Sequence, residues 1–366
     1  MGIQCGIVGL PNVGKSTLFN ALTSTAAAQA ANYPFCTIEP NVGRVAVPDE
    51  RIEKLAKVAG SKEIIPTFLE FVDIAGLVRG ASKGEGLGNQ FLSHIREVDA
   101  IIHVLRCFDD PNIIHVEGNV DPLRDAETVE TELVLADLES VERRIPQLEK
   151  KAKGNDKLAK EELAVMQKVF VLLAEGKPAR QVEVSAEEKP ILKRLQFITS
   201  KPMLYVCNVE EEKAATGNDF SKKVQEMAAK NGAEAVIISA AIESEVAQLG
   251  SDDDKKEFLE GLGLKETGLS SIIRAAYKLL NLITFFTVGP KEAHAWTVRR
   301  GACAPESAGA IHTDFEKGFI RAETISYQDY ITFAGEQGAK DNGKMRLEGK
   351  DYITNDGDLF HFRFNV

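Results

Sequence analysis

The chain of 366 residues is longer than a single typical hydrophobic core, so its length predicts two or three domains. A hydrophobic content of 44% and a charged content of 27% are typical of globular proteins, and the formal net charge of −11 argues against non-specific nucleic-acid binding by the whole surface. The five cysteines have an odd total and no Cys-x-x-Cys pair, which indicates neither a disulfide framework nor a zinc site. We expect a cytoplasmic protein, because no apolar run is long enough to span a bilayer and residues 4–8 read as a core strand without a preceding signal peptide.

The predicted strand at residues 4–8 leads into a glycine-rich turn and an amphipathic helical segment from Ser16 to Ser24. The turn, residues 9–17, reads Gly-Leu-Pro-Asn-Val-Gly-Lys-Ser-Thr and matches Gly-x-x-x-x-Gly-Lys-Ser/Thr in full. Backbone N–H groups of such a loop, together with the start of the following helix, surround phosphate groups. The alternative, an accidental glycine-rich turn, is disfavoured by the strand before it and the helix after it.

Individual residues of this loop have expected roles in nucleotide chemistry. Lys15 should reach the β- and γ-phosphates and stabilise the transition state, which makes it a candidate catalytic residue. Ser16 should offer its hydroxyl to Mg²⁺. The remaining phosphate-binding candidates of the loop are Asn12, Val13, Gly14 and Thr17.

Two further segments are expected to serve the metal ion and the γ-phosphate. Residues 32–40 have many turn-forming residues and predict a loop, in which Thr37 is the one candidate for a threonine that senses Mg²⁺. A strand predicted at residues 67–72, after another at 42–47, ends in Asp73-Ile74-Ala75-Gly76. Asp73 is expected to hold Mg²⁺ through water, and the N–H of Gly76 to meet the γ-phosphate.

The glycine-rich residues 77–90 read as a second switch loop that a ligand would order. Leu77 stands where Ras-like enzymes have the glutamine that orients the attacking water, and an aliphatic side chain cannot do this. Hydrolysis is therefore expected to be slow, or to use a polar group from elsewhere in the chain or from a partner. The polar groups within the chain that we considered are Arg79, Lys83, His94, His103 and His115.

The histidines of this set have different expected positions. His103 lies in the predicted strand at residues 100–105 and is expected to be packed in the core. His115 follows the carboxyl end of that strand, on the nucleotide side of a parallel sheet, and is the candidate catalytic histidine. A surface role is the alternative for His115.

From Ala126 onward, apolar residues recur at helical spacing in two runs separated by Gly154-Asn155-Asp156, which predicts an antiparallel helical hairpin. The runs are Val134, Leu138, Val141, Ile145 and Leu148, then Leu163, Met166, Phe170 and Leu173. Pro146 is expected to kink the first arm. Basic residues near the tip form either a solvated helix end or a patch that contacts RNA phosphates. They are Arg143, Arg144, Lys150, Lys151, Lys153, Lys157 and Lys160.

Strands predicted at residues 203–207 and 235–238 end where P-loop GTPases recognise the base through Asn-Lys-x-Asp and a Ser-Ala loop. Here Val209 replaces the lysine and Glu211 the aspartate. The longer acidic side chain displaces the carboxylate that would pair with guanine, so guanine selectivity should be lost and ATP favoured. The candidate base contacts are Asn208, Val209, Glu211, Ser239 and Ala240.

After a predicted helix at 271–281, short β-rich runs predict a separate small α+β domain. The predicted strands are residues 282–288, 295–298, 330–333, 350–353 and 359–366. Residues 312–321 form a polar stretch with aromatic residues, which suits either an interface or a loop that caps the core.

Taken together, the phosphate loop, residues 32–40, residues 73–88 and Asn208-x-x-Glu211 resemble the YchF family of Obg-related P-loop NTPases over essentially the whole chain. The resemblance implies an α/β P-loop NTPase fold with a Ras-like mixed sheet, divided between residues 1–125 and 200–281. It implies a helical coiled-coil insertion at 126–199 and a C-terminal β-grasp (TGS) domain at 282–366. It also relates Asn12 to a P-loop asparagine linked to K⁺ binding.

The function expected from these features is that of a slow, ribosome-associated ATPase that acts as a nucleotide-dependent switch in translation or stress response. Its partners would be ATP, with GTP accepted less selectively, and the ribosome or large-subunit RNA and protein, but neither membrane nor DNA. The cofactor would be Mg²⁺, with K⁺ as a further candidate. The alternatives are a GTP-specific ribosome-assembly GTPase and a non-hydrolysing scaffold that nucleotide orders.

Overall fold

The computed structural model describes residues 2–30, 42–74, 88–154 and 156–365, except for the side chains of residues 25–30, 88–90 and 252. The chain forms two compact units. Unit 1 comprises residues 1–27, 37–44 and 70–275, and unit 2 comprises residues 28–36, 45–69 and 276–366. Segments at 45–69 therefore pack with the C-terminal part of the chain, a grouping that the sequence analysis did not predict.

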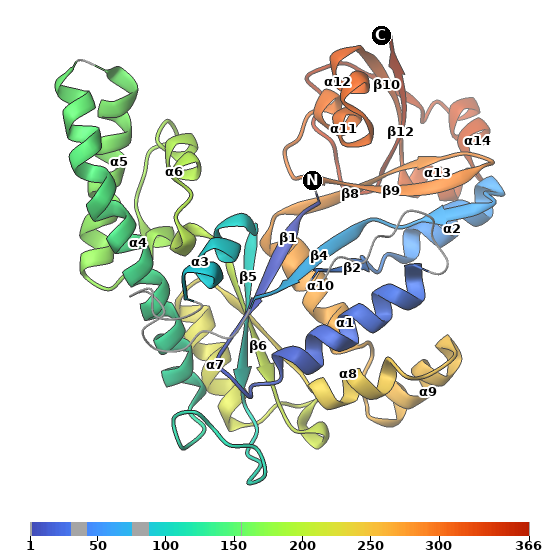
Figure 1. Ribbon diagram of the computed structural model, residues 1–366. Helices are drawn as coiled ribbons and strands as arrows, with labels where there is room; N and C mark the ends of the chain where they lie inside the picture. Colours follow the sequence, from blue (N-terminus) through green and yellow to red (C-terminus); the bar gives the residue numbers. More distant parts are fainter. Residues whose placement is uncertain (1, 31–41, 75–87, 155, 366) are drawn as a thin grey trace. The chain divides into compact units, whose positions relative to one another are not determined.

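Unit 1 is built on a sheet with the strand order β2-β4-β1-β5-β6-β7, in which β1 and β5 are central (Figure 1). The pairs β1–β4, β1–β5, β5–β6 and β6–β7 are parallel, so the carboxyl ends of these strands meet at one edge. Every residue of β5 and β6 is buried, which explains why both read as continuous apolar runs in the sequence. The strands are β1 (Gln4–Val8), β2 (Val42–Ala46), β4 (Phe68–Asp73), β5 (Ala100–Arg106), β6 (Met203–Asn208) and β7 (Glu234–Ile238).

Helices that lie between consecutive strands of this sheet include α1 (Lys15–Ala30), α3 (Gly88–Glu97) and α7 (Asp219–Lys230). The strand β7 is followed by α8 (Ala240–Val246), α9 (Asp252–Gly261) and α10 (Gly268–Leu279), whose last residues belong to unit 2. Short 3₁₀ helices lie at Ala179–Gln181 (η2), Ile198–Ser200 (η3) and Glu211–Lys213 (η4). The predicted helices at 16–24 and 271–281 thus correspond to α1 and α10.

The predicted helical hairpin consists of α4 (Pro122–Lys153) and α5 (Lys157–Ala174), followed by the short helix α6 (Lys189–Leu195). Asp121 and Asp156 cap the starts of α4 and α5 by accepting hydrogen bonds from backbone N–H groups. Of the nine apolar residues predicted to form the seam, five are buried members of a single core cluster and the other four pack against it, which confirms the helical periodicity. The helix α4 continues through Pro146 as one element.

A buried carboxylate joins the hairpin to the segment that returns to the sheet. Asp137 in α4 is fully buried and accepts hydrogen bonds from the backbone N–H groups of Ile198 (3.0 Å) and Thr199 (2.8 Å). It also accepts one from the hydroxyl of Thr199 at 2.7 Å. Because all three donors are buried, the carboxylate fixes where α4 crosses the base of the insertion.

Unit 2 contains a sheet with the strand order β11-β10-β12-β8-β9-β3. Its strands are β3 (Glu63–Ile65), β8 (Leu282–Val288), β9 (Glu292–Arg299), β10 (Phe319–Ser326), β11 (Arg346–Glu348) and β12 (Asp358–Phe364). The helices are α2 (Glu50–Ala59), α11 (Ala304–Ile311), α12 (Thr313–Lys317), α13 (Tyr327–Thr332) and α14 (Glu336–Asp341). Apolar side chains form two core clusters, one that includes α2 and α13 and one that includes α11.

Three expectations for this unit are corrected. The residues predicted as a strand at 330–333 lie at the end of α13, a helix whose start is capped by Ser326. The buried Tyr330 belongs to the core cluster that includes α2. Residues 350–353 form no strand and contribute one isolated bridge, Cys303 to Ile353. Residues 312–321 do not form the loop that was considered as a cap of the core, because they contain α12 and the start of β10.

Among the helices in the described part of the chain, none is both long and apolar enough to cross a membrane.

The Asp137 contacts predict a large loss of stability on truncation. Asp137→Ala leaves buried N–H and O–H donors unpaired, so we expect the free energy of unfolding to fall by about 2–4 kcal/mol. Urea unfolding followed by far-ultraviolet circular dichroism measures this. Glu142→Ala, at an exposed position of the same helix, is the matched control and should change stability by less than about 0.5 kcal/mol. Equal midpoints for both variants would contradict the role of Asp137.

Candidate nucleotide-binding site

The loop between β1 and α1 has the backbone conformation that its glycines permit. Gly9 and Gly14 have positive φ angles of 155° and 99°. A Cβ at Gly9 would lie 2.5 Å from the carbonyl oxygen of Val104, and one at Gly14 would lie 2.3 Å from Nδ2 of Asn208. The two glycines therefore let the loop pack directly on β5 and against the end of β6, with Ser16 and Thr17 exposed at the start of α1.

Lys15 is held inside this loop by the carbonyl groups of its own backbone. Its Nζ donates hydrogen bonds to the oxygens of Gly9 (2.9 Å) and Leu10 (2.7 Å), and the residue is only 8% exposed. Burial lowers the pKa of Lys15 to about 8, whereas the nearby carboxylate of Asp73 acts in the opposite direction. The loop thus holds a partly desolvated ammonium group, to which phosphate oxygens would be attracted.

Asp73 ends β4 and is paired in register with Ile7 of β1, which places it beside the strand that enters the loop. Burial raises the pKa of Asp73, and the positive charge of Lys15 opposes this shift. Its Oδ1 is buried and has no hydrogen-bond partner among the residues that the structure describes. This carboxylate oxygen and the exposed hydroxyl of Ser16 are oxygen ligands of the kind that hydrated Mg²⁺ prefers. Thr37 and Gly76 lie outside the described residues.

Asn208, at the end of β6, joins the phosphate loop to the loop that follows β7. Its Nδ2 donates to the carbonyl oxygen of Val13 at 3.0 Å, and its Oδ1 accepts from the N–H of Ala240 at 2.9 Å. Asn208, Val209 and Ser239 are each 5% exposed or less, so this junction is well packed. Glu211 lies apart from it, exposed at the start of η4.

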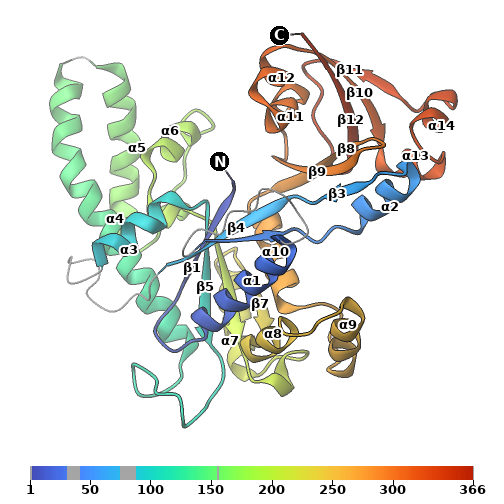
Figure 2. The same ribbon diagram turned by 45° about the vertical axis from the view of Figure 1, so that its right-hand side comes forward.

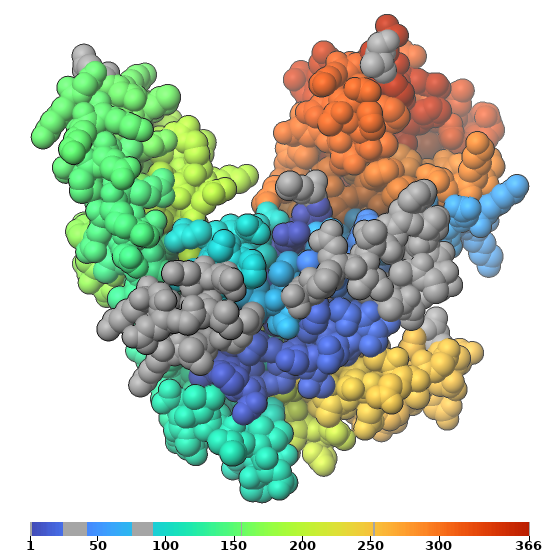
Figure 3. Space-filling view, in the orientation of Figure 1, coloured from blue at the N-terminus to red at the C-terminus, as the bar shows by residue number. Residues whose placement is uncertain are grey.

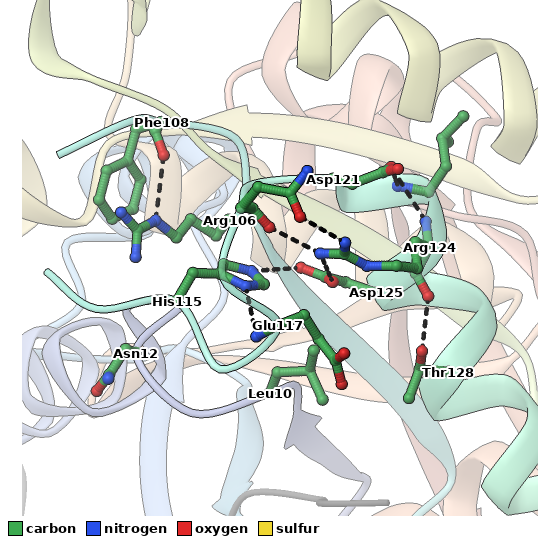
Figure 4. Close-up of polar contacts among 12 residues, drawn as sticks. Leu10, Asn12, Arg106, Phe108, His115, Glu117, Asp121, Arg124, Asp125 and Thr128 are labelled. Atoms are coloured by element: carbon green, nitrogen blue, oxygen red, sulfur yellow. Dashed lines mark hydrogen bonds and ion pairs between the residues drawn. The ribbon is translucent and has the colours of Figure 1, made fainter. Parts of the chain in front are cut away.

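The structure corrects the surface role considered for His115, which is only 8% exposed. Figure 4 shows its imidazole directed at Asp125, with Glu117 on its other side. Nε2 lies 2.8 Å from Oδ2 of Asp125, and Nδ1 accepts a hydrogen bond from the backbone N–H of Glu117 at 3.1 Å. A carboxylate at Nε2 and an N–H at Nδ1 together select the tautomer protonated at Nε2.

The segment that carries His115 is tied to the phosphate loop and to β5. Nδ2 of Asn12 donates to the carbonyl oxygen of Ile114 at 3.1 Å, and Asn12 has a positive φ of 61°. The buried guanidinium of Arg106 donates to three carbonyl groups of the segment, those of Phe108, Asp110 and Ile113. The residue directly before His115 is therefore hydrogen-bonded to the phosphate loop.

Sequence reasoning did not identify Arg106 or Asp125. An arginine at the end of an apolar strand is normally solvated, and an aspartate in the first turn of a helix is normally explained by the helix dipole. Only the fold shows that both side chains are about 1% exposed and that Asp125 faces an imidazole. The expectation that His103 is a core residue is confirmed, because it is fully buried and burial lowers its pKa to about 3.

Two family models match parts of the chain. Residues 4–135 match a model described as a 50S ribosome-binding GTPase. Residues 282–365 match a model of the C-terminal region of YchF GTPases, described as a protein of unknown function.

Full-length relatives show similarity over the whole chain. Proteins named ribosome-binding ATPase YchF are 59% identical over 366 residues in Haemophilus influenzae and 55% identical over 368 residues in Bacillus subtilis, each covering 100% of both chains. The solved YchF GTPase of Schizosaccharomyces pombe is 40% identical, with a TM-score of 0.89 over 99% of this chain and 98% of that chain. A GTP-binding protein of Pyrococcus horikoshii, 22% identical with a TM-score of 0.62, shares the fold over 99% of this chain and 100% of that one. These findings confirm the P-loop α/β fold class.

The environment of Lys15 predicts how the affinity for a triphosphate depends on pH. The free protein should lose the Lys15 proton as the pH rises through about 8. Because phosphates attract the charged ammonium, binding above that pH must take up a proton, and affinity should fall by up to about tenfold per pH unit. Below that pH no such uptake is needed, and the affinity should be flat.

Calorimetric titration with ATP in two buffers of different ionisation enthalpy measures both the affinity and the proton uptake. Lys15→Arg is the matched control, because a guanidinium stays charged throughout this range and should remove the pH dependence at a lower overall affinity. An affinity for the unmodified protein that stays constant from about pH 7 to about pH 9.5 would contradict the assignment.

Proposed function

The chain belongs to the YchF family, and we propose that it hydrolyses ATP to ADP and phosphate as a nucleotide-dependent switch that binds the ribosome. The observation that supports this most directly is the loop at residues 9–17, which holds a buried ammonium close to the carboxylate of Asp73. One oxygen of that carboxylate has no hydrogen-bond partner among residues 2–30, 42–74, 88–154 and 156–365. This pair of opposite charges suits a triphosphate with its metal ion.

Mg²⁺ is the proposed cofactor, with Ser16 as a direct ligand, Asp73 as a ligand through water, and Thr37 as the switch-loop ligand. When bound, this ion neutralises phosphate charge. Asn12 is the proposed K⁺ ligand. Since its Nδ2 is engaged with Ile114, its side-chain oxygen is the atom left to bind a cation.

The proposed chemistry is an attack by water on the γ-phosphate without a protein nucleophile. Lys15 exchanges its two carbonyl partners for phosphate oxygens, and backbone N–H groups from residues 12–17, together with that of Gly76, stabilise the charge that develops. His115 is the proposed base. Asp125 fixes the proton on Nε2 and stabilises an imidazolium, while Nδ1 becomes the acceptor once it releases the N–H of Glu117.

The proposed preference for ATP rests on the junction around Asn208. Both polar atoms of that side chain are used within the protein, so Asn208 supports the pocket by bridging Val13 and Ala240. The base would then meet Val209, Ser239 and Ala240, with Glu211 in place of the aspartate that pairs with guanine. The carboxylate of Glu211 is one methylene further from the backbone than that of an aspartate and lies on an exposed residue, so it should discriminate little between guanine and adenine.

The hairpin tip is the proposed contact with ribosomal RNA. Figure 3 shows the side chains of α4 and α5 as a projecting arm, and the lysines near its end are exposed. They are Lys150, Lys151, Lys153, Lys157 and Lys160. Arg143 is exposed as well, and Arg143 and Lys157 each lie within 4 Å of a glutamate on their own helix. Arg144 instead donates a hydrogen bond to the carbonyl oxygen of Leu195. A local basic patch on an acidic chain suits salt-dependent contact with phosphates.

The remaining parts of the proposal follow from these. Intrinsic turnover is slow because Leu77 replaces the water-orienting glutamine, and the ribosome as partner places the protein in the cytoplasm. The proposed domains are a nucleotide domain at residues 1–125 and 200–281, the insertion at 126–199, and a TGS domain at 282–366, although residues 45–69 of the first segment pack with the C-terminal part of the chain.

Phosphate release measured with ATP or GTP, with and without purified ribosomes, tests the function. We expect ATP to be turned over in preference to GTP, faster with ribosomes present, and Lys15→Ala to abolish release. A large preference for GTP would favour a ribosome-assembly GTPase, and no release under either condition would favour a scaffold. Nucleotide-dependent co-sedimentation with ribosomes, comparing ATP, ADP and GTP, tests the partner separately.

The role of His115 predicts a specific kinetic effect. His115→Ala should lower kcat by about 10²–10⁴-fold and leave the affinity for ATP nearly unchanged, because a base acts only in the chemical step. Asp125→Asn should cause a smaller fall. Val116→Ala alters an exposed neighbour and should leave kcat unchanged. If His115→Ala weakened ATP binding and kcat equally, His115 would be a structural residue instead.

A further inference from the structure

The sheet of unit 2 contains a gap between β8 and β12. These two strands are parallel and are paired only at Leu359 with Phe286, whereas β12 stays paired with β10 from Asp358 to Phe364. On its other side, β8 is paired with β9 along its whole length. In Figure 2, β12 runs away from the β8–β9 hairpin toward the C-terminus. Beyond Leu359, β12 therefore has an edge that is not paired with β8, and β8 itself ends two residues past the pair, at Val288.

A cavity of about 730 Å³ occupies this gap. On one side it is lined by members of the core cluster that contains α2, among them Val288, Ile325 and Leu359. On the other side it is lined by members of the cluster that contains α11, among them Phe360 and Phe362. Because successive residues of a strand point to opposite faces, a cavity that reaches both clusters passes through the sheet.

From this geometry we propose that the gap binds an extended, basic peptide segment of a partner protein, which adds a strand between β8 and β12. The free edge of β12 supplies backbone hydrogen-bonding groups that a strand can pair with. Alternate side chains of the peptide would enter the two apolar halves of the cavity, as a period of two requires. A rigid small molecule would use the apolar walls but not the strand edge.

The charges at the rim favour a basic peptide. Glu292 and Glu336 are exposed there, and Lys291 is the one lysine or arginine among the described lining residues. Glu323 also lines the cavity, but the guanidinium of Arg363 already binds its carboxylate through two contacts of 3.1 Å. One carboxylate oxygen of Glu292 lies 3.6 Å from Nδ1 of His294, and burial lowers the pKa of that histidine, so Glu292 keeps its negative charge beside that of Glu336. Complementary charge of this kind selects a partner and speeds its association.

This site is independent of the proposed nucleotide chemistry, because all its residues belong to unit 2. It also lies in the region matched by the family model described as a protein of unknown function.

Trp296 provides a direct signal for binding. It is the one tryptophan of the chain, it lines the cavity, and its Nε1–H donates to the hydroxyl of Thr287 in β8 at 2.9 Å. A peptide that enters between β8 and β12 should change this environment and therefore the tryptophan fluorescence.

The experiment titrates the full chain with the capped peptide Lys-Lys-Val-Leu-Val-Leu-Lys-Lys. We expect saturable binding with a dissociation constant in the micromolar range. The same peptide with alternate backbone nitrogens methylated should bind at least about tenfold more weakly, because methylation removes the N–H donors that pair with a strand and keeps the side chains. Replacing the lysines with glutamates should also weaken binding, and added salt should weaken the lysine form.

A pair of glycine variants tests the location. Gly289 lines the cavity and does not have a positive φ, and no described atom lies within 4 Å of a Cβ added to it. Gly289→Phe should therefore fill the gap without backbone strain and reduce the affinity for the peptide at least about tenfold. Gly349→Phe is the matched control, since Gly349 is equally open but lies outside the cavity. Unchanged ATP turnover and circular dichroism confirm that both variants are folded.

Three results would overturn the proposal. One is the absence of saturable binding up to about 1 mM peptide. Another is equal affinity of the methylated peptide, which would make the cavity a simple apolar pocket. The third is a concentration-dependent dimer that Gly289→Phe abolishes, which would make a second copy of this chain the occupant.

Discussion

The side chain of Asn208 is the contact on which the candidate nucleotide site depends. Its amide binds the carbonyl of Val13 in the phosphate loop and the N–H of Ala240 after β7, so one residue sets the distance between the two loops that would hold phosphates and base. It can do so because parallel strands bring the ends of β1, β6 and β7 to one edge of the sheet. A buried amide with both polar groups satisfied is rigid, and a rigid frame lowers the cost of ordering a bound nucleotide.

The electrostatics of the site fit the free form of a phosphate-binding protein. Lys15 is bound by two neutral carbonyl groups, and a buried oxygen of Asp73 has no partner within the described part of the chain. Burial lowers the pKa of Lys15 and raises the pKa of Asp73, so it favours the neutral form of each group. A triphosphate with its metal ion would supply the missing opposite charges, so nucleotide binding should relieve an unfavourable arrangement in addition to making new contacts.

Much of the chain could be predicted from the residues. The phosphate loop, the buried strands β1, β5 and β6, and the seam of the α4–α5 hairpin all have strong local periodicity or a complete motif. Prediction failed in unit 2, where residues 330–333 look β-prone but end the short helix α13. Burial of Tyr330 against α2 decided that case, and α2 is far away in the sequence.

The sequence by itself determined that a phosphate loop follows the first strand, that the guanine-specific aspartate is replaced by Glu211, and that a helical arm is inserted before β6. Each of these is a property of neighbouring residues or of a short repeat, so it can be seen without the fold. The tertiary structure decided that Asp125 faces His115, that Asn12 holds Ile114, and that β8 and β12 separate around a cavity. These features join segments from different elements, and their energies depend on burial and distance, which no local pattern records.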